Sequence, residues 1–230
     1  MPRPRLRTRP LLAAAAAIAV AASGGCAIFG LAGAMGQSFE TQKLIEVAAE
    51  YDGLQDSTVA VVVNVGLDIR WSSPTLATDV TNFVSRQLAA NVPGVQVVNP
   101  AAVLAWQYRT AQWDALPYGE IAEQLGVDRV VYIDIYEYRL HPPGNRYLWE
   151  GVCAATVGVI ERDGFDVDSF VDAFEVQASF PDIDGVGRDQ MAESAVAAGL
   201  KSKFITRVAW LFYKHEEPKY PRLYRPELDA

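Results

Sequence analysis

Apolar runs along residues 58–180 predict the strands of a β-sheet. The run over residues 58–65 is almost entirely β-branched, which is typical of a strand buried on both faces. The later runs predict strands at residues 95–98, 129–140, 147–161 and 171–180. Turns rich in Pro, Gly and Asp separate the strands after residue 129, so we expect an antiparallel meander there.

Apolar positions spaced three and four residues apart predict helices around these strands. Ser73 and Pro74 are suited to open one helix, as Asn99 and Pro100 are to open the next, and Gly126 is suited to close a third. The predicted helices cover residues 41–51, 73–92, 100–113, 117–126 and 189–214. This order predicts an α/β fold: a mixed sheet with helices mainly on one face, in a two-layer sandwich.

Several segments resemble a known domain. They are TVAVVVNV, VQVVNP, EIAEQLGVDRVVYIDI and a hairpin ending NRYLWEGV, all between Thr58 and about Leu211, and the most specific is the helix before Leu125-Gly126-Val127-Asp128. They resemble the N-terminal domain of the translocation protein TolB and related envelope lipoproteins. The latter include auxiliary components of trans-envelope transporters, curli-secretion lipoproteins and activators of penicillin-binding proteins. The resemblance implies a function in binding other envelope proteins, and no binding residue of these families maps onto this chain.

The N-terminus has the pattern of an export signal. Four arginines within the first nine residues precede a run from Leu11 to Ala22 of only Leu, Ala, Ile and Val. Small residues then lead to Cys26, where the sequence resembles the lipobox of bacterial lipoproteins, although Ser23 stands where that motif usually has Leu. The resemblance implies acylation of Cys26. The alternative is an uncleaved membrane anchor, because no charge occurs between Leu11 and Gly36.

These patterns predict four segments along the chain. Residues 1–25 form a signal peptide, residues 26–38 a lipid anchor with a flexible glycine-rich spacer, residues 39–215 a single α/β domain, and residues 216–230 a C-terminal tail. Loss of residues 1–25 removes four arginines and no acid. The 20 Lys and Arg then fall to 16 against 28 Asp and Glu, a net charge of −12 that disfavours nucleic acid as a partner.

Residues with catalytic or metal-binding chemistry are few. His141 and His215 are far apart, and Cys153 lies in a small, apolar run typical of a core residue. The acidic residues between Asp163 and Asp184 do not have the spacing of a calcium loop. We therefore predict no enzyme activity, no cofactor and no metal site, with a periplasmic divalent-cation-dependent enzyme or small-ligand binder as the alternative.

The strand at residues 129–140 carries the candidate binding residues. Val131, Ile133 and Ile135 alternate with polar and aromatic residues, so the period of two predicts one core face and one aromatic face. The predicted partner-binding residues on the second face are Tyr132, Asp134, Tyr136 and Tyr138. The alternative is that the tail around Tyr220 folds over this face.

The sequence thus predicts a non-enzymatic lipoprotein of the cell envelope. It would be lipid-anchored to the inner or outer membrane, face the periplasm, and serve as an accessory subunit in secretion, transport or cell-wall assembly. Its partners would be other envelope proteins or further copies of the same chain.

Overall fold

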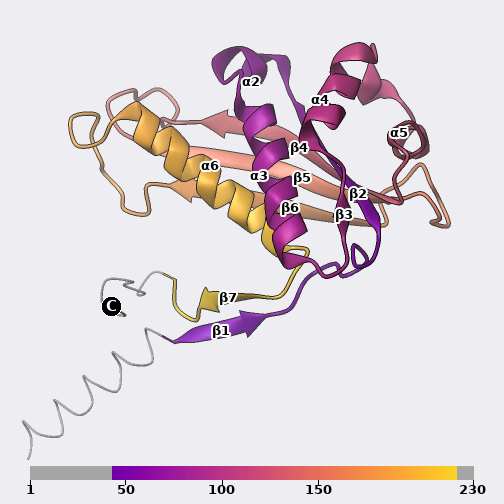
Figure 1. Cartoon of the computed structure of the whole chain (residues 1–230). Helices are drawn as coiled ribbons and strands as arrows, with labels where there is room; N and C mark the ends of the chain where they lie inside the picture. Colours follow the sequence, from indigo (N-terminus) through magenta and orange to yellow (C-terminus); the bar gives the residue numbers. More distant parts are fainter. Residues whose placement is uncertain (1–42, 222–230) are drawn as a thin grey trace, which may run out of the picture. The chain divides into compact units, whose positions relative to one another are not determined.

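The computed structural model of the chain describes residues 43–221 (Figure 1). The predicted signal peptide and the whole of the predicted anchor and spacer, Cys26 included, lie outside these residues, as do residues 222–230 of the predicted tail. The chain divides into two compact units, one spanning Ala48–His215 and the other formed by the segments on either side of it. Each unit is described by itself below.

The larger unit is built on a five-stranded mixed sheet in the order β3-β2-β4-β5-β6. Strand β2 pairs in parallel with β3 and β4, and the β4-β5 and β5-β6 pairs are antiparallel. The strands are β2 (Thr58–Val65), β3 (Gln96–Val97), β4 (Arg129–Arg139), β5 (Gly151–Glu161) and β6 (Asp172–Phe180). The predicted mixed sheet with an antiparallel meander is confirmed, and β5 begins four residues later than the predicted strand at residue 147.

Two long helices pack on one face of the sheet and form the main core with it. They are α3 (Leu76–Asn91) and α6 (Glu193–Trp210), which lie across the sheet in Figure 1. In α3, Leu76, Val80, Val84 and Leu88 follow the predicted spacing and are buried, whereas Phe83 of the same predicted set is exposed. The α6 helix is shorter at both ends than the predicted helix over residues 189–214.

A second, smaller core lies on the opposite face of the sheet. It is formed by α4 (Pro100–Arg109), the 3-10 helix η1 (Trp113–Ala115) and α5 (Tyr118–Leu125). The Asn99 side chain accepts a hydrogen bond from the Ala101 backbone N–H and caps α4. Gly126 ends α5 with a φ of 68°, the left-handed conformation that favours glycine. Helices therefore cover part of both faces.

A short helix, α2 (Leu67–Ser72), follows β2 directly. Only Ile69 of its six residues is buried, so this helix contributes one anchor to the main core. No described helix has the length and apolarity that a membrane span requires.

Strands β1 (Leu44–Val47) and β7 (His215–Pro218) form a separate two-stranded sheet and run in opposite directions in Figure 1. The predicted helix over residues 41–51 is wrong, because residues 44–47 are a strand. The Lys219 backbone N–H donates to the Lys43 carbonyl across this pair. A strand formed through a partner about 170 residues away depends on non-local pairing and not on local apolar spacing.

Candidate protein-binding surface

The predicted aromatic face of β4 is not a single face in the structure. Val131, Ile133 and Ile135 lie in the main core as predicted. Tyr132, however, is only 5% exposed and belongs to the second core. The expectation that it faces solvent is wrong, because the second helical layer covers this part of the sheet.

Rings from the second core pack around Tyr132. Its ring centroid lies 6.3 Å from that of Trp113, 5.6 Å from that of Tyr118 and 5.9 Å from that of Phe170. Gly158, directly opposite Tyr132 on β5, allows this arrangement, since a Cβ there would lie 2.4 Å from the Phe170 ring. The covering layer therefore comes from α5, η1 and Phe170.

A β-bulge moves Tyr138 to the other face of the sheet. The β4-β5 register shifts between Ile135 and Glu137, which reverses the alternation of side chains beyond that point. Tyr138 accordingly packs against the main core, and burial raises the pKa of its hydroxyl to about 12. The prediction that Tyr138 shares a face with Tyr132 and Tyr136 is wrong for this reason.

Asp134 and Tyr136 remain accessible and belong to polar networks on the sheet. The Asn64 amide donates to Asp134 Oδ1 at 3.0 Å, so this carboxylate has a partner within the chain. Tyr136 donates to Glu175 Oε2 at 2.9 Å, and Thr156 donates to the other oxygen of Glu175 at 2.8 Å. Two of the four predicted binding residues thus stay available to a partner.

A second group of exposed aromatic residues lies where the parallel strands end. On α2, Leu67 and Trp71 are 71% and 86% exposed, and their spacing of four places them on the same side of the helix. Tyr108, near the end of α4, is 93% exposed. We call Leu67, Arg70, Trp71 and Tyr108 the carboxyl-end surface. Tyr136 lies at the same end of the sheet, since its neighbour Ile135 pairs with the last residue of β2.

Arg70 and Tyr108 of the carboxyl-end surface line a cavity of about 200 Å³. Its apolar lining includes Val65, Leu104 and Trp113, and Arg70, Gln107 and Tyr108 supply polar groups. The Arg70 guanidinium donates to the Val65 carbonyl at 3.4 Å, and the Gln107 amide donates to the Val63 carbonyl at 3.0 Å. The crevice beyond the carboxyl ends of parallel strands is where open α/β sheets usually bind ligands.

Sequence reasoning did not identify the carboxyl-end surface. The segment between the predicted strand at residues 58–65 and the predicted helix from Ser73 was assigned to no element. The available signal was the pair Leu67 and Trp71, two large apolar residues four apart directly after a buried strand. Leu67 and Trp71 are exposed because α2 packs on the core through Ile69 alone, and the sequence does not reveal this packing.

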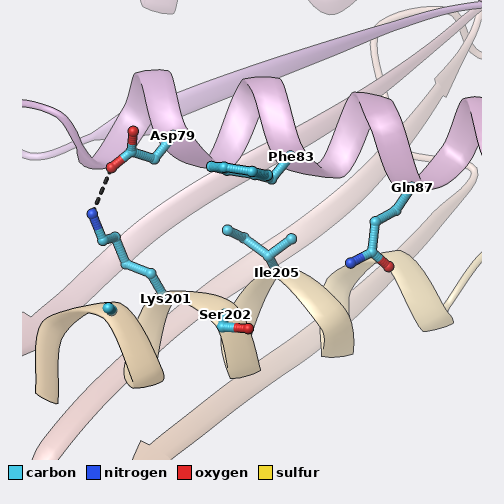
Figure 2. Close-up of a pocket in the computed structure, with 7 residues that line it drawn as sticks. Asp79, Phe83, Gln87, Lys201, Ser202 and Ile205 are labelled. Carbon is cyan, nitrogen blue, oxygen red and sulfur yellow. Dashed lines mark hydrogen bonds and ion pairs between the residues drawn. The ribbon is translucent and has the colours of Figure 1, made fainter. Parts of the chain in front are cut away.

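A larger groove of about 420 Å³ lies between α3 and α6 (Figure 2). Asp79 and Lys201 form an ion pair across it, with 2.5 Å between Oδ2 and Nζ. Phe83 from α3 and Ile205 from α6 extend into the space between the helices. Arg86 lies over the Phe83 ring, 5.5 Å from its centroid. The groove is therefore crossed by side chains that already hold the two helices together.

The histidines and the described cysteine have structural surroundings. His141 stacks on Trp149 with ring centroids 4.5 Å apart, and His215 stacks on Trp210 at 4.4 Å. Cys153 is buried, and burial raises the pKa of its thiol. Such a thiol does not form the thiolate that nucleophilic catalysis requires.

Several of the acidic residues already have partners. Asp163 pairs with Arg129, Asp182 pairs with Lys203, and Asp168 accepts from the Gly119 backbone N–H. The Arg129 hydrogen bond holds the pKa of the Asp163 carboxyl below its usual value. Among residues 43–221, no group of three or more His, Cys, Asp or Glu is arranged to hold a metal ion.

Comparisons with known proteins identify similar folds at low sequence identity. No family model and no curated protein matches the chain. The PelC dodecamer from Paraburkholderia phytofirmans is 14% identical with a TM-score of 0.41, covering 80% of this chain and 98% of that one. Lipoprotein GNA1162 from Neisseria meningitidis is 13% identical with a TM-score of 0.42, covering 64% and 94%. The LpoB C-terminal domain from Salmonella enterica is 17% identical with a TM-score of 0.35, covering 56% and 87%.

GNA1162 is described in its name as a lipoprotein. At these identities and TM-scores the likeness carries no argument about function.

Proposed function

We propose that this protein is an envelope lipoprotein that acts by binding other envelope proteins and not by catalysis. In this proposal the chain is exported, acylated at Cys26 and held at the periplasmic side of the inner or outer membrane. It then serves as an accessory subunit in secretion, transport or cell-wall assembly. The N-terminal signal pattern supports the export and anchoring steps.

The exposed aromatic residues of the carboxyl-end surface carry the binding part of the proposal. Trp and Tyr are enriched at the centres of protein interfaces because they bury a large area at a small entropic cost. Single exposed apolar residues are ordinary, but Leu67 and Trp71 share one side of α2. Tyr108 and Arg70 line the same cavity beside them. Burial by a partner accounts for this clustering, because only Ile69 of α2 is buried in the chain itself.

Site-specific photocrosslinking in intact envelopes tests the proposal. A photoreactive residue at Gln112, an exposed position between α4 and η1, should form a discrete crosslinked species. The double variant Trp71→Ala with Tyr108→Ala should lose that species while its melting temperature stays close to that of the parent. Exposed substitutions usually change stability by only about 0.5 kcal/mol.

The matched control is Tyr147→Ala, which removes an equally exposed tyrosine from a loop. This variant should keep the crosslink. Equal crosslinking by the double variant and the parent would show that the carboxyl-end surface is not the binding site. A species of twice the subunit mass would identify the partner as a second copy.

The alternative function predicts a different result. A divalent-cation-dependent enzyme or ligand binder gains stability from its ion, by an amount that grows with the ratio of ion concentration to Kd. We expect no change in melting temperature with calcium or magnesium. A clear rise with either ion would favour the alternative.

A further inference from the structure

Arg70 is the arginine that lines the cavity of the carboxyl-end surface. Several arginines of the larger unit pair with carboxylates, among them Arg129, Arg139 and Arg162. Within residues 43–221, Arg70 forms no such ion pair, and its hydrogen bond to the Val65 carbonyl uses one of its five N–H donors. Arg70 thus brings its positive charge to the cavity that it lines.

The size of this cavity indicates what it can hold. Small-molecule sites typically enclose about 300–1,000 Å³. The cavity here is about 200 Å³, and a cavity of about 150 Å³ is enough to admit benzene. It therefore has room for one side chain from a larger partner. Val65, Leu104 and Trp113 make the lining suitable for an apolar side chain.

We propose that this cavity binds an apolar side chain of a partner protein together with a neighbouring carboxylate, which pairs with Arg70. This inference rests on the proposed function and specifies the partner's chemistry. The planar guanidinium matches a carboxylate in two parallel hydrogen bonds. Gln107, whose side-chain amide nitrogen donates to the Val63 carbonyl, also lines the cavity.

The charge of the chain favours a single carboxylate over a polyanion. The full chain has a net charge of −8, so a nucleic acid or an anionic membrane is repelled by the molecule as a whole. One acidic side chain on a folded partner brings one negative charge to Arg70. The apolar residue beside it contributes burial that a free anion lacks.

Two short peptide probes separate the contribution of charge to binding from the contribution of shape. The acetylated, amidated dipeptides Leu-Glu and Leu-Gln differ in charge and hardly in size. In NMR titrations of the detergent-extracted full chain, Leu-Glu should shift the side-chain signals of Arg70 and Gln107. It should bind about tenfold more tightly than Leu-Gln, because a hydrogen bond to a charged group is stronger than one to a neutral group, and tenfold in affinity corresponds to about 1.4 kcal/mol.

Substitution at Arg70 tests the assignment directly. Arg70→Gln should reduce the affinity for Leu-Glu to that for Leu-Gln. Arg70→Lys should give an intermediate affinity for Leu-Glu, because lysine keeps the charge but lacks the planar guanidinium that forms two parallel hydrogen bonds. Arg109→Gln is the matched control: Arg109 is exposed, donates to the Ala105 carbonyl and does not line the cavity, so the preference should persist.

Equal binding of the two dipeptides, or shifts that map away from the cavity, would overturn this inference. So would an unchanged preference in Arg70→Gln. The double variant at Trp71 and Tyr108 could lose the photocrosslink while the two dipeptides bind equally. That combination would support the proposed function and contradict only the inference that the partner supplies a carboxylate. Persistence of the photocrosslink in that double variant would instead contradict the binding part of the proposed function, which places the partner at the carboxyl-end surface.

Discussion

Truncation of Phe204 tests whether α6 is integral to the fold. Phe204 is fully buried in the main core, with Leu200 and Val208 of the same helix beside it on the apolar face. Phe→Ala substitutions in cores cost about 3–5 kcal/mol, from the lost transfer free energy and from the cavity that remains. The upper part of this range applies, because the sheet beneath α6 limits how far the cavity can collapse. Domains are stable by about 5–15 kcal/mol, so Phe204→Ala removes a large fraction of the total.

Urea unfolding followed by tryptophan fluorescence measures this loss. Ser202→Ala, an exposed change on the same helix, should stay within about 0.5 kcal/mol of the parent. Leu211→Ala should cost less than Phe204→Ala, because Leu211 follows the last residue of α6 and is only partly buried. A loss below about 0.5 kcal/mol for Phe204→Ala would show that α6 is peripheral and that the reasoning from its burial is wrong.

Four further predictions concern other parts of the chain. Mass spectrometry of the membrane-extracted protein should find a lipid-bearing N-terminus at Cys26, and an intact peptide spanning Leu11 to Gly36 would contradict it. Cys153 should react with a thiol reagent only after unfolding, because it is buried and its pKa is raised. Burial raises the pKa of the Tyr138 hydroxyl from 10.0 to about 12. The stability that Tyr138 contributes is therefore complete below pH 10 and is lost as the pH rises through about 12. Base titrations of the parent and of Tyr138→Phe should diverge in this pH range. Gly158→Ala should lower the free energy of unfolding by about 1–3 kcal/mol, since the added methyl overlaps the Phe170 ring; an unchanged urea midpoint would show that the ring moves freely.

Local patterns were sufficient to predict much of the larger unit. The β-branched run of β2 predicted a strand buried on both faces, and its alternate residues do lie in the two cores. The spacing of Leu76, Val80, Phe83, Val84 and Leu88 predicted the apolar side of α3, and all of these residues except Phe83 are buried. Gly126 ends α5 in the conformation for which glycine is favoured. In each case the information lies within a few residues of the element that it determines.

The errors arise where distant segments decide the local structure. Residues 44–47 form a strand because of pairing with β7, although their apolar spacing also fits a short helix. Tyr132 is buried because Phe170, Trp113 and Tyr118 pack over it. The bulge after Ile135 inverts the period of two, so counting along the strand misplaces Tyr138. None of these contacts can be predicted from the residues that neighbour them in the sequence.

The same bulge explains why the binding surface is better sought at the end of the sheet than along β4. Had the alternation continued, Tyr136 and Tyr138 would form one aromatic face with Tyr132; instead, of the three, only Tyr136 is exposed. Other exposed aromatic residues, Tyr147 and Phe165, lie in separate loops. At the carboxyl-end surface, by contrast, exposed aromatic residues coincide with a cavity and with an arginine that no described carboxylate neutralises. Exposed aromatic residues and an arginine beside a cavity are the features that the proposed protein partner would bury.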